Sequence, residues 1–323
     1  TYQVARRIGA PFTLAITGTP LENSLGDLWS MFSLAAPGLF PRLEGFTENY
    51  RKPVEKNGET DVLGRLRARI RPFMLRRTKR EVVKELPEKV EQITRLELTP
   101  AHRRRYDQHL TRERTRVLGM LEDMDRNRVA IFRALTKLRQ LALDPRLVDT
   151  DLPPIPSAKI TALLGQIQEL AEEGHRALVF SSFTGFLKLV RGTLEAEGIE
   201  YVYLDGRTRD RPARIARFRE GGAPVFLISL KAGGFGLTLT EADYVFVLDP
   251  WWNPAAENQA VDRAHRIGQT RAVNVYRMVS ADTIEEKVVA LQQRKRDLFA
   301  SVVDTGEFRS AAITATDIRG LLE

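Results

Sequence analysis

The sequence of 323 residues contains no cysteine, which excludes disulfide bonds, thiolate metal sites and a cysteine nucleophile. It has only four histidines, and His102, His109, His175 and His265 are too scattered to suggest a metal cluster. No apolar run reaches the length of a membrane span, and no signal-peptide pattern opens the sequence. These absences favour an intracellular protein whose function does not use a membrane or a thiol.

Acidic residues are fewer than basic ones. The sequence has 42 aspartates and glutamates against 50 lysines and arginines, which gives a formal net charge of +8 at pH 7. Such a balance favours a polyanionic partner, above all nucleic acid. Between Arg65 and Arg80 stand eight basic residues and no acidic one.

The length of the sequence allows two domains with their own cores. Because the sequence begins at Thr1 and has a helical pattern from its first residues, we expect it to be a piece of a longer protein.

Sequence patterns typical of helices predominate in the first half of the chain. Residues 13–17, "TLAIT", predict a buried strand that ends in a turn. A helix is expected over residues 24–35, with leucine and aromatic side chains on one face. Residues 42–148 are helical and rich in arginine, and Thr99 followed by Pro100 is typical of a helix start. The prolines of residues 149–157 predict a linker.

After the linker, short apolar strands alternate with helices. The expected strands are residues 176–182, 200–206, 224–230, 243–249 and 272–280. The expected helices are residues 158–173, 185–197, 210–220 and 253–267, and a last one that opens at Thr283 with Glu286 in a capping-box pattern and runs to about residue 303. Strands that are apolar throughout, alternating with helices, predict a parallel sheet covered on both faces.

Polar and glycine-rich text follows four of these strands. Ligands of parallel sheets bind beyond the carboxyl ends of the strands, so we expect these four segments to gather at one edge. They are Ser181-Ser182, residues 205–208, residues 231–234 and residues 250–253.

The segment "DRAHRIGQ", residues 262–269, carries two arginines. Arg263 and Arg266 are three residues apart, so on a helix they share one face, and Gln259 extends the same stripe. Such a stripe is either a solvated surface or a site for an anion.

Several stretches, taken together, resemble the C-terminal half of a Swi/Snf-type ATPase, a DNA translocase of helicase superfamily two. They occur in the order of that family and are "LAITGTPLENSLGDLWSMFSL", "RPFMLRRTKREVVKELPEK", "ALVFSSFT", "YLDGRT", "VFLISLKAGGFGLTLTEADYVFVLDPWWNPAAENQAVDRAHRIGQ" and "VYRMVSADTIEEK". The family's Walker A pattern, G-x-x-x-x-G-K-[ST], occurs nowhere in the sequence, and its acidic magnesium motif is likewise absent.

The resemblance implies an α/β fold, a RecA-like parallel-sheet helicase C-terminal lobe preceded by a helical insertion and the tail of a first RecA-like lobe. On this interpretation residues 1–40 end the first lobe and contain the third helicase motif. Residues 41–150 form the helical protrusion and linker, residues 151–282 the second lobe, and residues 283–323 a C-terminal helix and tail.

The resemblance also implies the site residues. Arg263 and Arg266 resemble arginine fingers that reach the γ-phosphate of ATP held by the first lobe, and Gln259 is implied to contact the phosphate or its water. Such fingers stabilise the charge of the transition state. The residues implied in nucleotide binding or coupling are Gly234, Gly236, Asp262, Thr17, Gly18 and Thr19. The residues implied in DNA contact are Ser182, Thr184, Gly206, Arg207, Thr208, Lys231 and Trp252. No metal ligand is assigned.

The chain departs from the family pattern in a few places. Ser181-Ser182 stand for the usual Ser-Gln, Thr238 stands for an asparagine, and "ALDP" at residues 142–145 stands for "CNHP". Trp251 occupies a position that is often polar, so no role is carried over to it.

The expected function is that of the second motor lobe of an ATP-dependent double-strand DNA translocase, inactive as a fragment but a DNA-dependent ATP hydrolase in the complete protein. Its cofactor is ATP with Mg²⁺, held mostly by the upstream lobe. Its partners are double-stranded DNA, the upstream lobe and a DNA-bound protein substrate, with no membrane. Alanine- and arginine-rich text favours a bacterial cytoplasm or nucleoid.

Two other interpretations belong to different classes of protein. One is a non-catalytic module that binds DNA or a protein partner. The other is a fold that binds a nicotinamide or methyl donor, which the glycine-rich sequence of residues 230–237 resembles in pattern. A glycine-rich loop after the first strand of the domain is typical of that fold, but here the loop follows the third strand.

Overall fold

The computed structural model describes residues 2–17, 25–57, 59–75, 77, 79–83, 85–150, 155–232, 237–252, 254–300 and 315–322. The chain divides into two compact units, one of residues Thr1–Thr78 with Leu291–Thr314 and one of residues Lys79–Ala290 with Ala315–Glu323. Each unit is described by itself.

The first unit is helical in its described residues. Its elements are α1 (Tyr2–Arg6), α2 (Leu25–Ala35), α3 (Leu43–Phe46), the π-helix η1 (Thr47–Arg51), α4 (Lys52–Asn57), α5 (Thr60–Ile70) and the 3₁₀ turn η2 (Arg71–Phe73). The predicted helix over residues 24–35 is confirmed by α2, whose apolar face is buried. Its Trp29 donates from Nε1 to the carbonyl oxygen of Phe40 at 3.0 Å, and the Phe40 ring packs edge-on against Phe46.

The prediction of a buried strand at residues 13–17 is wrong. These residues are irregular and exposed, with Leu14 and Ile16 at 70% and 89% of their full accessibility. A strand needs a neighbour to accept its backbone hydrogen bonds, and no described strand pairs with this segment. Apolar text alone is therefore not enough to make a strand here.

The second unit contains a six-stranded sheet in the order β1-β6-β5-β2-β4-β3, and every pair of neighbours is parallel. The strands are β1 (Lys89–Leu96), β2 (Ala177–Ser181), β3 (Tyr201–Leu204), β4 (Val225–Ser229), β5 (Tyr244–Val247) and β6 (Val273–Ser280). The five strands predicted after the linker are thus confirmed, each within a few residues of its expected ends, as is the parallel sheet.

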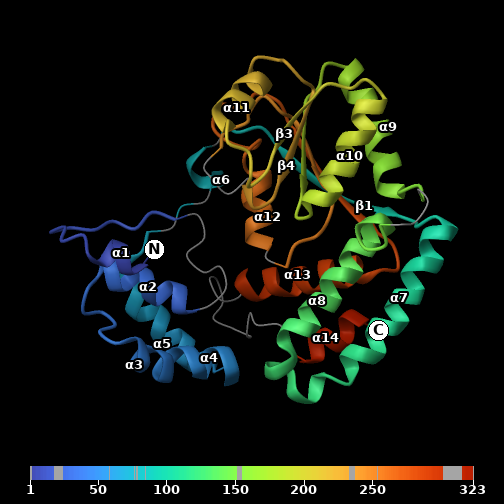
Figure 1. Cartoon of the computed structure of the whole chain (residues 1–323). Coiled ribbons are helices and arrows are strands. Elements are labelled where there is room, and N and C mark those ends of the chain that lie inside the picture. Colours follow the sequence, from blue (N-terminus) through green and yellow to red (C-terminus); the bar gives the residue numbers. More distant parts are fainter. Residues whose placement is uncertain are drawn as a thin grey trace. The chain divides into compact units, whose positions relative to one another are not determined.

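Helices cover both faces of this sheet (Figure 1). The covering helices are α9 (Ala158–Glu172) and α10 (Thr184–Ala196) on one face, and α11 (Arg211–Arg219) and α12 (Pro254–Val261) on the other. Alternate side chains of each strand point into opposite cores: on β2, Val179 packs with α9 and α10, whereas Phe180 packs with α11 and α12. Burial on both faces explains why the strands are apolar throughout.

The first strand of the sheet corrects the helical prediction for residues 42–148. Residues Lys89–Leu96 form β1, which pairs with β6 from Lys89↔Val273 to Leu96↔Ser280. β1 is an edge strand and is mostly exposed, so it carries charged side chains, which also discourage pairing with other chains. Because of these charged residues, the sequence of β1 resembles that of the arginine-rich helices around it, and so its pattern predicts a helix.

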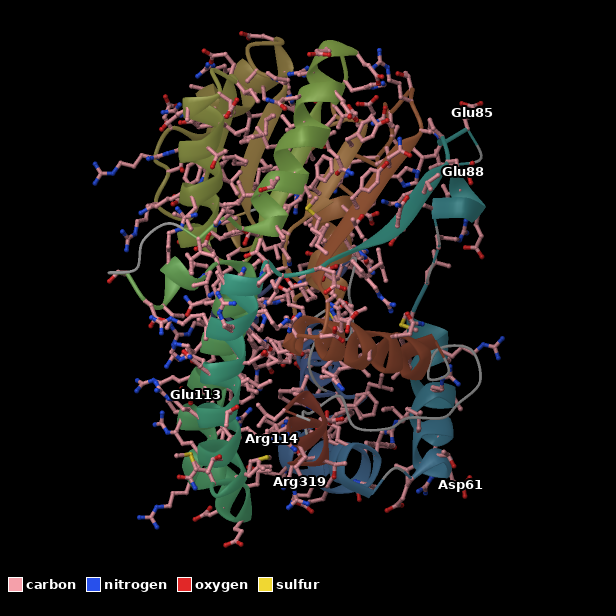
Figure 2. All side chains as sticks on the ribbon, turned by 90° about the vertical axis from the view of Figure 1, so that its right-hand side faces the viewer. Asp61, Glu85, Glu88, Glu113, Arg114 and Arg319 are labelled. Carbon is pink, nitrogen blue, oxygen red and sulfur yellow. The ribbon has the colours of Figure 1, made fainter. Side chains whose placement is uncertain are left out.

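Two long helices, α7 (Pro100–Leu118) and α8 (Met124–Leu143), follow β1 and pack on each other. The predicted start at Thr99 is confirmed, because the Thr99 hydroxyl accepts from the His102 N–H. Charged side chains cover the outside of α7 (Figure 2). The buried Glu113 of α7 pairs with Lys137 of α8 at 3.2 Å.

The last elements are α13 (Ile284–Ala300) and α14 (Ala315–Leu322). No helix of the described residues has the length and apolar content to cross a membrane.

A buried ion pair ties α9 and α13 to the ends of two strands. Lys159 Nζ donates to the Glu285 carboxylate at 2.5 Å, and both side chains are almost fully buried. Lys159 also donates to the carbonyl oxygens of Leu248 and Met278, so all three of its ammonium protons are used. Glu285 accepts in addition from the Ser280 N–H at 2.8 Å.

Candidate functional site

The carboxyl ends of the parallel strands lie at one edge of the sheet, as the sequence predicts. β2 ends at Ser181, β3 at Leu204, β4 at Ser229 and β5 at Val247, so the described residues of the four polar segments begin at this edge. The described part of this edge contains two groups of interacting side chains, one after β2 and β5 and one after β3.

Asp249 is the centre of the first group. It is fully buried and accepts from the Ser181 hydroxyl at 2.5 Å, from the Ser182 N–H at 3.0 Å and from the Ser182 hydroxyl. One carboxylate therefore holds the end of β2 against the end of β5. Ser182 is partly exposed, and its hydroxyl is engaged within the protein.

Arg139 of α8 is the cation of this group. Its side chain is 2% exposed, and Nη2 donates to Asp249 Oδ2 at 3.0 Å, to the Pro250 carbonyl oxygen at 2.7 Å and to the Ser182 hydroxyl at 3.2 Å. Burial lowers the pKa of Arg139, and the charge of Asp249 opposes that shift. A buried arginine on this helix is evident only from the structure, because "LTKLRQLAL" reads as an ordinary amphipathic helix.

Three aromatic rings surround the same guanidinium group. The Arg139 Cζ lies 5.0 Å from the ring centre of Phe183, 5.2 Å from that of Trp251 and 5.3 Å from that of Trp252. Cations over aromatic faces are attracted by the ring quadrupole. Arg139 therefore orients Trp252, which is partly exposed, and links α8 to the strand edge.

Arg139→Lys is expected to keep the charge but to lose the planar contacts with the rings, because lysine has neither the fork nor the flat face of arginine. We expect a changed tryptophan emission and weaker thermal stability of the chain. The matched control is Arg133→Lys on the exposed side of the same helix, which should change neither. Identical spectra and melting for wild type and Arg139→Lys would contradict this role.

The second group is the turn after β3. Asp205 accepts from the Arg207 N–H at 2.8 Å and from the hydroxyl groups of Tyr203 and Thr208. Burial by itself raises the pKa of Asp205, but these hydrogen bonds outweigh it and hold the pKa below its usual value. The ordered turn leaves Gly206 and Arg207 exposed, with Thr208 beside them.

The structure leaves other predicted contact residues accessible. Thr184 at the start of α10 and Lys231 after β4 are both exposed. Thr17 is exposed in the first unit. Gly18, Thr19, Gly234 and Gly236 lie outside the described residues.

The two arginines of "DRAHRIGQ" do not share a helix face. The predicted helix over residues 253–267 is too long, because α12 ends at Val261, and residues 262–268 form successive turns. In these turns the Arg263 N–H bonds to the Ala260 carbonyl oxygen and the Arg266 N–H to that of Ala264.

The turns nevertheless bring both arginines together. Arg263 Nη1 and Arg266 Nη1 donate to the same acceptor, the Leu237 carbonyl oxygen, at 3.2 and 3.3 Å. Arg266 also donates to the Thr238 hydroxyl at 3.0 Å. The pair therefore lies against the segment that leads from β4 to β5. The two guanidinium groups meet because the arginine side chains are long, although their backbones do not share a helix face.

The pair lacks a neutralising carboxylate among the described residues. Burial and the neighbouring charge of Arg266 lower the pKa of Arg263 to about 10. The charge of the adjacent Asp262 opposes this shift, but its carboxylate forms its ion pair with Lys79, at 2.9 Å. Two close positive charges, one of them buried, favour an anion that would relieve their repulsion.

The segment before β1 holds this loop from outside. Lys79 Nζ donates to the His265 carbonyl oxygen at 3.0 Å as well as pairing with Asp262. The His265 Nε2 in turn bonds to the Pro87 carbonyl oxygen at 2.8 Å. The segment before β1 thus holds the arginine loop at Asp262 and at His265.

Gln259 lies partly buried on α12, one turn before the arginine loop. That helix is anchored by Arg277 of β6, which donates to the buried Glu257 at 3.0 Å and to Glu91 of β1 at 2.9 Å. Among the described residues, no group of three or more histidine, aspartate or glutamate side chains is arranged to hold a metal ion.

Comparison with family models matches two parts of the chain. Residues 1–147 match the SNF2-related domain, and residues 158–268 match the helicase conserved C-terminal domain. The second match contains the strand edge and the arginine loop, whereas the first contains Arg139 and Lys79.

Curated relatives and solved structures agree with these matches. The chain is 39% identical to an uncharacterized ATP-dependent helicase of Mycoplasma pneumoniae over 95% of its own length and 30% of that protein. It is 34% identical to the putative ATP-dependent helicase/translocase YwqA of Bacillus subtilis over 93% of its own length and 33% of that protein. The chain thus spans about a third of these relatives.

Among solved structures, the Sulfolobus solfataricus SWI2/SNF2 ATPase core in complex with dsDNA aligns with a TM-score of 0.59 and 30% identity, covering 100% of this chain and 69% of that one. The C-terminal part of the Fun30 ATPase domain aligns with a TM-score of 0.55 and 26% identity, covering 64% of this chain and 90% of that one.

Proposed function

The chain belongs to the SNF2 family of helicase-like ATPases, and from this premise we propose that it is the C-terminal motor part of a DNA-dependent ATPase that moves along double-stranded DNA. It contributes arginine fingers and DNA backbone contacts, while an upstream lobe of the complete protein binds ATP and Mg²⁺. We propose a bacterial cytoplasm or nucleoid as its location, in line with the bacterial relatives.

The observation that carries this proposal is the arginine pair. Arg263 and Arg266 converge on one carbonyl oxygen, and neither pairs with a described carboxylate. Guanidinium groups present planar sets of donors that match phosphate oxygens. The pair therefore suits the charge that develops on the γ-phosphate during phosphoryl transfer.

When ATP is bound by the upstream lobe, it supplies the phosphoryl group that water attacks. Arg266, which is partly exposed, would turn from Leu237 and Thr238 to the phosphate oxygens. Arg263 is buried and would hold the pair in position as well as add charge. Gln259 and Asp262 would stay beside them, Asp262 through its pair with Lys79. A finger from a second lobe makes hydrolysis depend on closure of the two lobes.

DNA contact is assigned to the strand edge. Backbone N–H groups, hydroxyls and cations bind phosphates without reading sequence, as a motor on any sequence requires. Thr184, Gly206, Arg207, Thr208 and Lys231 have accessible atoms there. Ser182 would take part through its backbone or after exchange of its hydroxyl from Asp249, and Trp252 would connect this edge to Arg139.

The complete protein, with its upstream segment, is expected to hydrolyse ATP and to do so much faster with duplex DNA. The chain of 323 residues alone is expected to bind duplex DNA but not to hydrolyse ATP. Turnover is measured by phosphate release with and without duplex. A complete protein that binds DNA without any turnover would replace the proposal with the non-catalytic binding module.

A further inference from the structure

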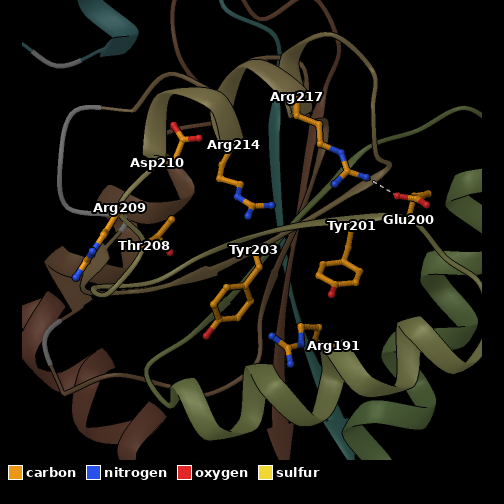
Figure 3. A pocket seen from close by; sticks show the side chains of 9 residues that line it. All are labelled: Arg191, Glu200, Tyr201, Tyr203, Thr208, Arg209, Asp210, Arg214 and Arg217. Atoms are coloured by element: carbon orange, nitrogen blue, oxygen red, sulfur yellow. Dashed lines mark hydrogen bonds and ion pairs between the residues drawn. The ribbon is translucent and has the colours of Figure 1, made fainter.

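A basic groove runs along β3, the free edge strand of the sheet. Its volume is about 580 Å³. Figure 3 shows Tyr201 and Tyr203 on β3, Arg191 on α10, Arg214 on α11 and Arg209 on the loop between β3 and α11. The remaining lining residues are Glu200, Thr208, Asp210 and Arg217.

Four arginines and two carboxylates line this groove. Arg217 pairs with Glu200, and Arg191 pairs with Glu195 outside the lining at 3.6 Å. Arg209 and Arg214 form no ion pair with any described residue, and both are exposed.

The remaining acid of the lining, Asp210, and the Tyr203 hydroxyl are engaged in hydrogen bonds within the protein. Asp210 caps α11 by accepting from the Ala213 N–H. Burial raises the pKa of Tyr203 to about 12, so its hydroxyl stays protonated and donates to Asp205 at 3.1 Å. The groove therefore offers unpaired guanidinium groups over fixed aromatic walls, which is a site for an anion.

We propose that this groove binds the phosphate backbone of one DNA strand where the duplex passes beyond the carboxyl-terminal edge of the sheet. The inference rests on the proposed function and extends its DNA path. Arg209 and Arg214 are the main cations of this second contact.

Continuity with the strand edge favours DNA over an acidic peptide. Thr208 and Arg209 line the groove, and they directly follow Gly206-Arg207, the exposed turn assigned to DNA above. A strand that leaves this turn enters the groove at its Thr208 end. From there the lining continues to Glu200 and Arg217 near the beginning of β3.

The size of the groove also agrees with a single strand. Cavities of about 300 to 1,000 Å³ enclose small molecules, so this groove has room for a short stretch of sugar-phosphate chain and not for a duplex. Guanidinium groups hold phosphates through paired N–H donors. Tyrosine rings can pack against the sugars of that strand.

The test compares two double variants of the chain that lose the same number of charges. Arg209→Ala with Arg214→Ala removes the unpaired cations of the groove, and Arg104→Ala with Arg112→Ala removes two exposed arginines of α7. Affinity for a labelled duplex of about 30 base pairs is measured over a range of salt concentrations, because each phosphate contact adds close to one to the salt slope. A poly-glutamate peptide is titrated in parallel.

We expect the groove variant to lower the salt slope by about two and to weaken binding about tenfold at low salt, whereas the α7 variant stays close to wild type. Equal slopes for the two variants would overturn the inference. Loss of poly-glutamate binding with DNA binding intact would overturn it in favour of an acidic protein partner. A wild-type chain that binds no duplex would instead refute the proposed function itself.

Discussion

Arg266→Ala is expected to lower ATP turnover by the complete protein about a thousandfold, the loss typical of a removed arginine finger. Arg266 is partly exposed, and among the described residues its side chain bonds only to loop atoms of Leu237 and Thr238, so we expect its removal to leave the fold intact. Duplex binding should be nearly unchanged, because the finger acts on the nucleotide. Turnover is measured at saturating ATP and DNA, and binding is measured separately.

Arg266→Lys separates charge from geometry at the same position. A lysine keeps the positive charge but lacks the fork of donors, so we expect most of the loss to remain. Arg104→Ala on α7 is the control and should retain full turnover. Turnover of Arg266→Ala at the wild-type rate would remove the finger assignment.

Arg263→Ala needs a second measurement, because Arg263 is buried and its side chain packs inside the loop. Its loss affects folding as well as rate. Turnover is therefore corrected for the folded fraction from a melting curve, and a remaining large loss would support a direct role.

Lys159→Met is expected to reduce the free energy of unfolding by about 3–5 kcal/mol, since it leaves Glu285 as an uncompensated buried charge. The change also removes donors from the carbonyl oxygens of Leu248 and Met278. Chemical denaturation of the chain measures the loss. The control, Lys188→Met on the exposed side of α10, should change stability by less than about 0.5 kcal/mol.

The loss should depend on pH in a definite direction. Burial raises the pKa of Glu285, and the charge of Lys159 opposes this. Without Lys159, the folded pKa of Glu285 rises further above the unfolded value of about 4.3. The folded state then binds more protons, so stability falls as pH rises through the window above the unfolded pKa. Lys159→Met is therefore expected to be least stable, relative to wild type, at neutral and alkaline pH.

A double variant tests whether the pair itself stabilises the fold. Lys159→Met with Glu285→Leu replaces both charges by apolar groups, and such replacements of buried pairs are often neutral or stabilising. We expect it to recover most of the loss of the single variant. A double variant as unstable as Lys159→Met would show that the lost hydrogen bonds, and not the stranded carboxylate, cause the damage.

Much of the second unit could be predicted from the sequence. The strands of this sheet after β1 are apolar throughout, and burial on two faces explains that pattern without reference to distant residues. The start of α7 at Thr99 is equally local, because a hydroxyl before Pro100 satisfies a free N–H of the first turn. The polar text after four strands predicted the shared edge, since parallel strands all end on the same side.

The failures occur where pairing or packing decides the outcome. Residues 13–17 have the apolar sequence of a buried strand, but no described strand pairs with them. Residues Lys89–Leu96 have a charged sequence, and they form a strand because they pair with β6. The end of α12 at Val261 follows from the contacts of the loop after it, in which Gln269 bonds to the carbonyl oxygens of Ala242 and Ala264.

The sequence by itself determined the fold class of the second unit, the order of its strands and helices after the linker, and the family, because these depend on local periodicity and on long contiguous motifs. Only the tertiary structure decided which distant groups meet. It placed Arg139 of α8 against Asp249 and two tryptophans, brought Arg263 and Arg266 to the Leu237 carbonyl oxygen, and left Arg209 and Arg214 unpaired along β3. Contacts between residues far apart in the chain have no local signal, because they form only when packing brings their elements together.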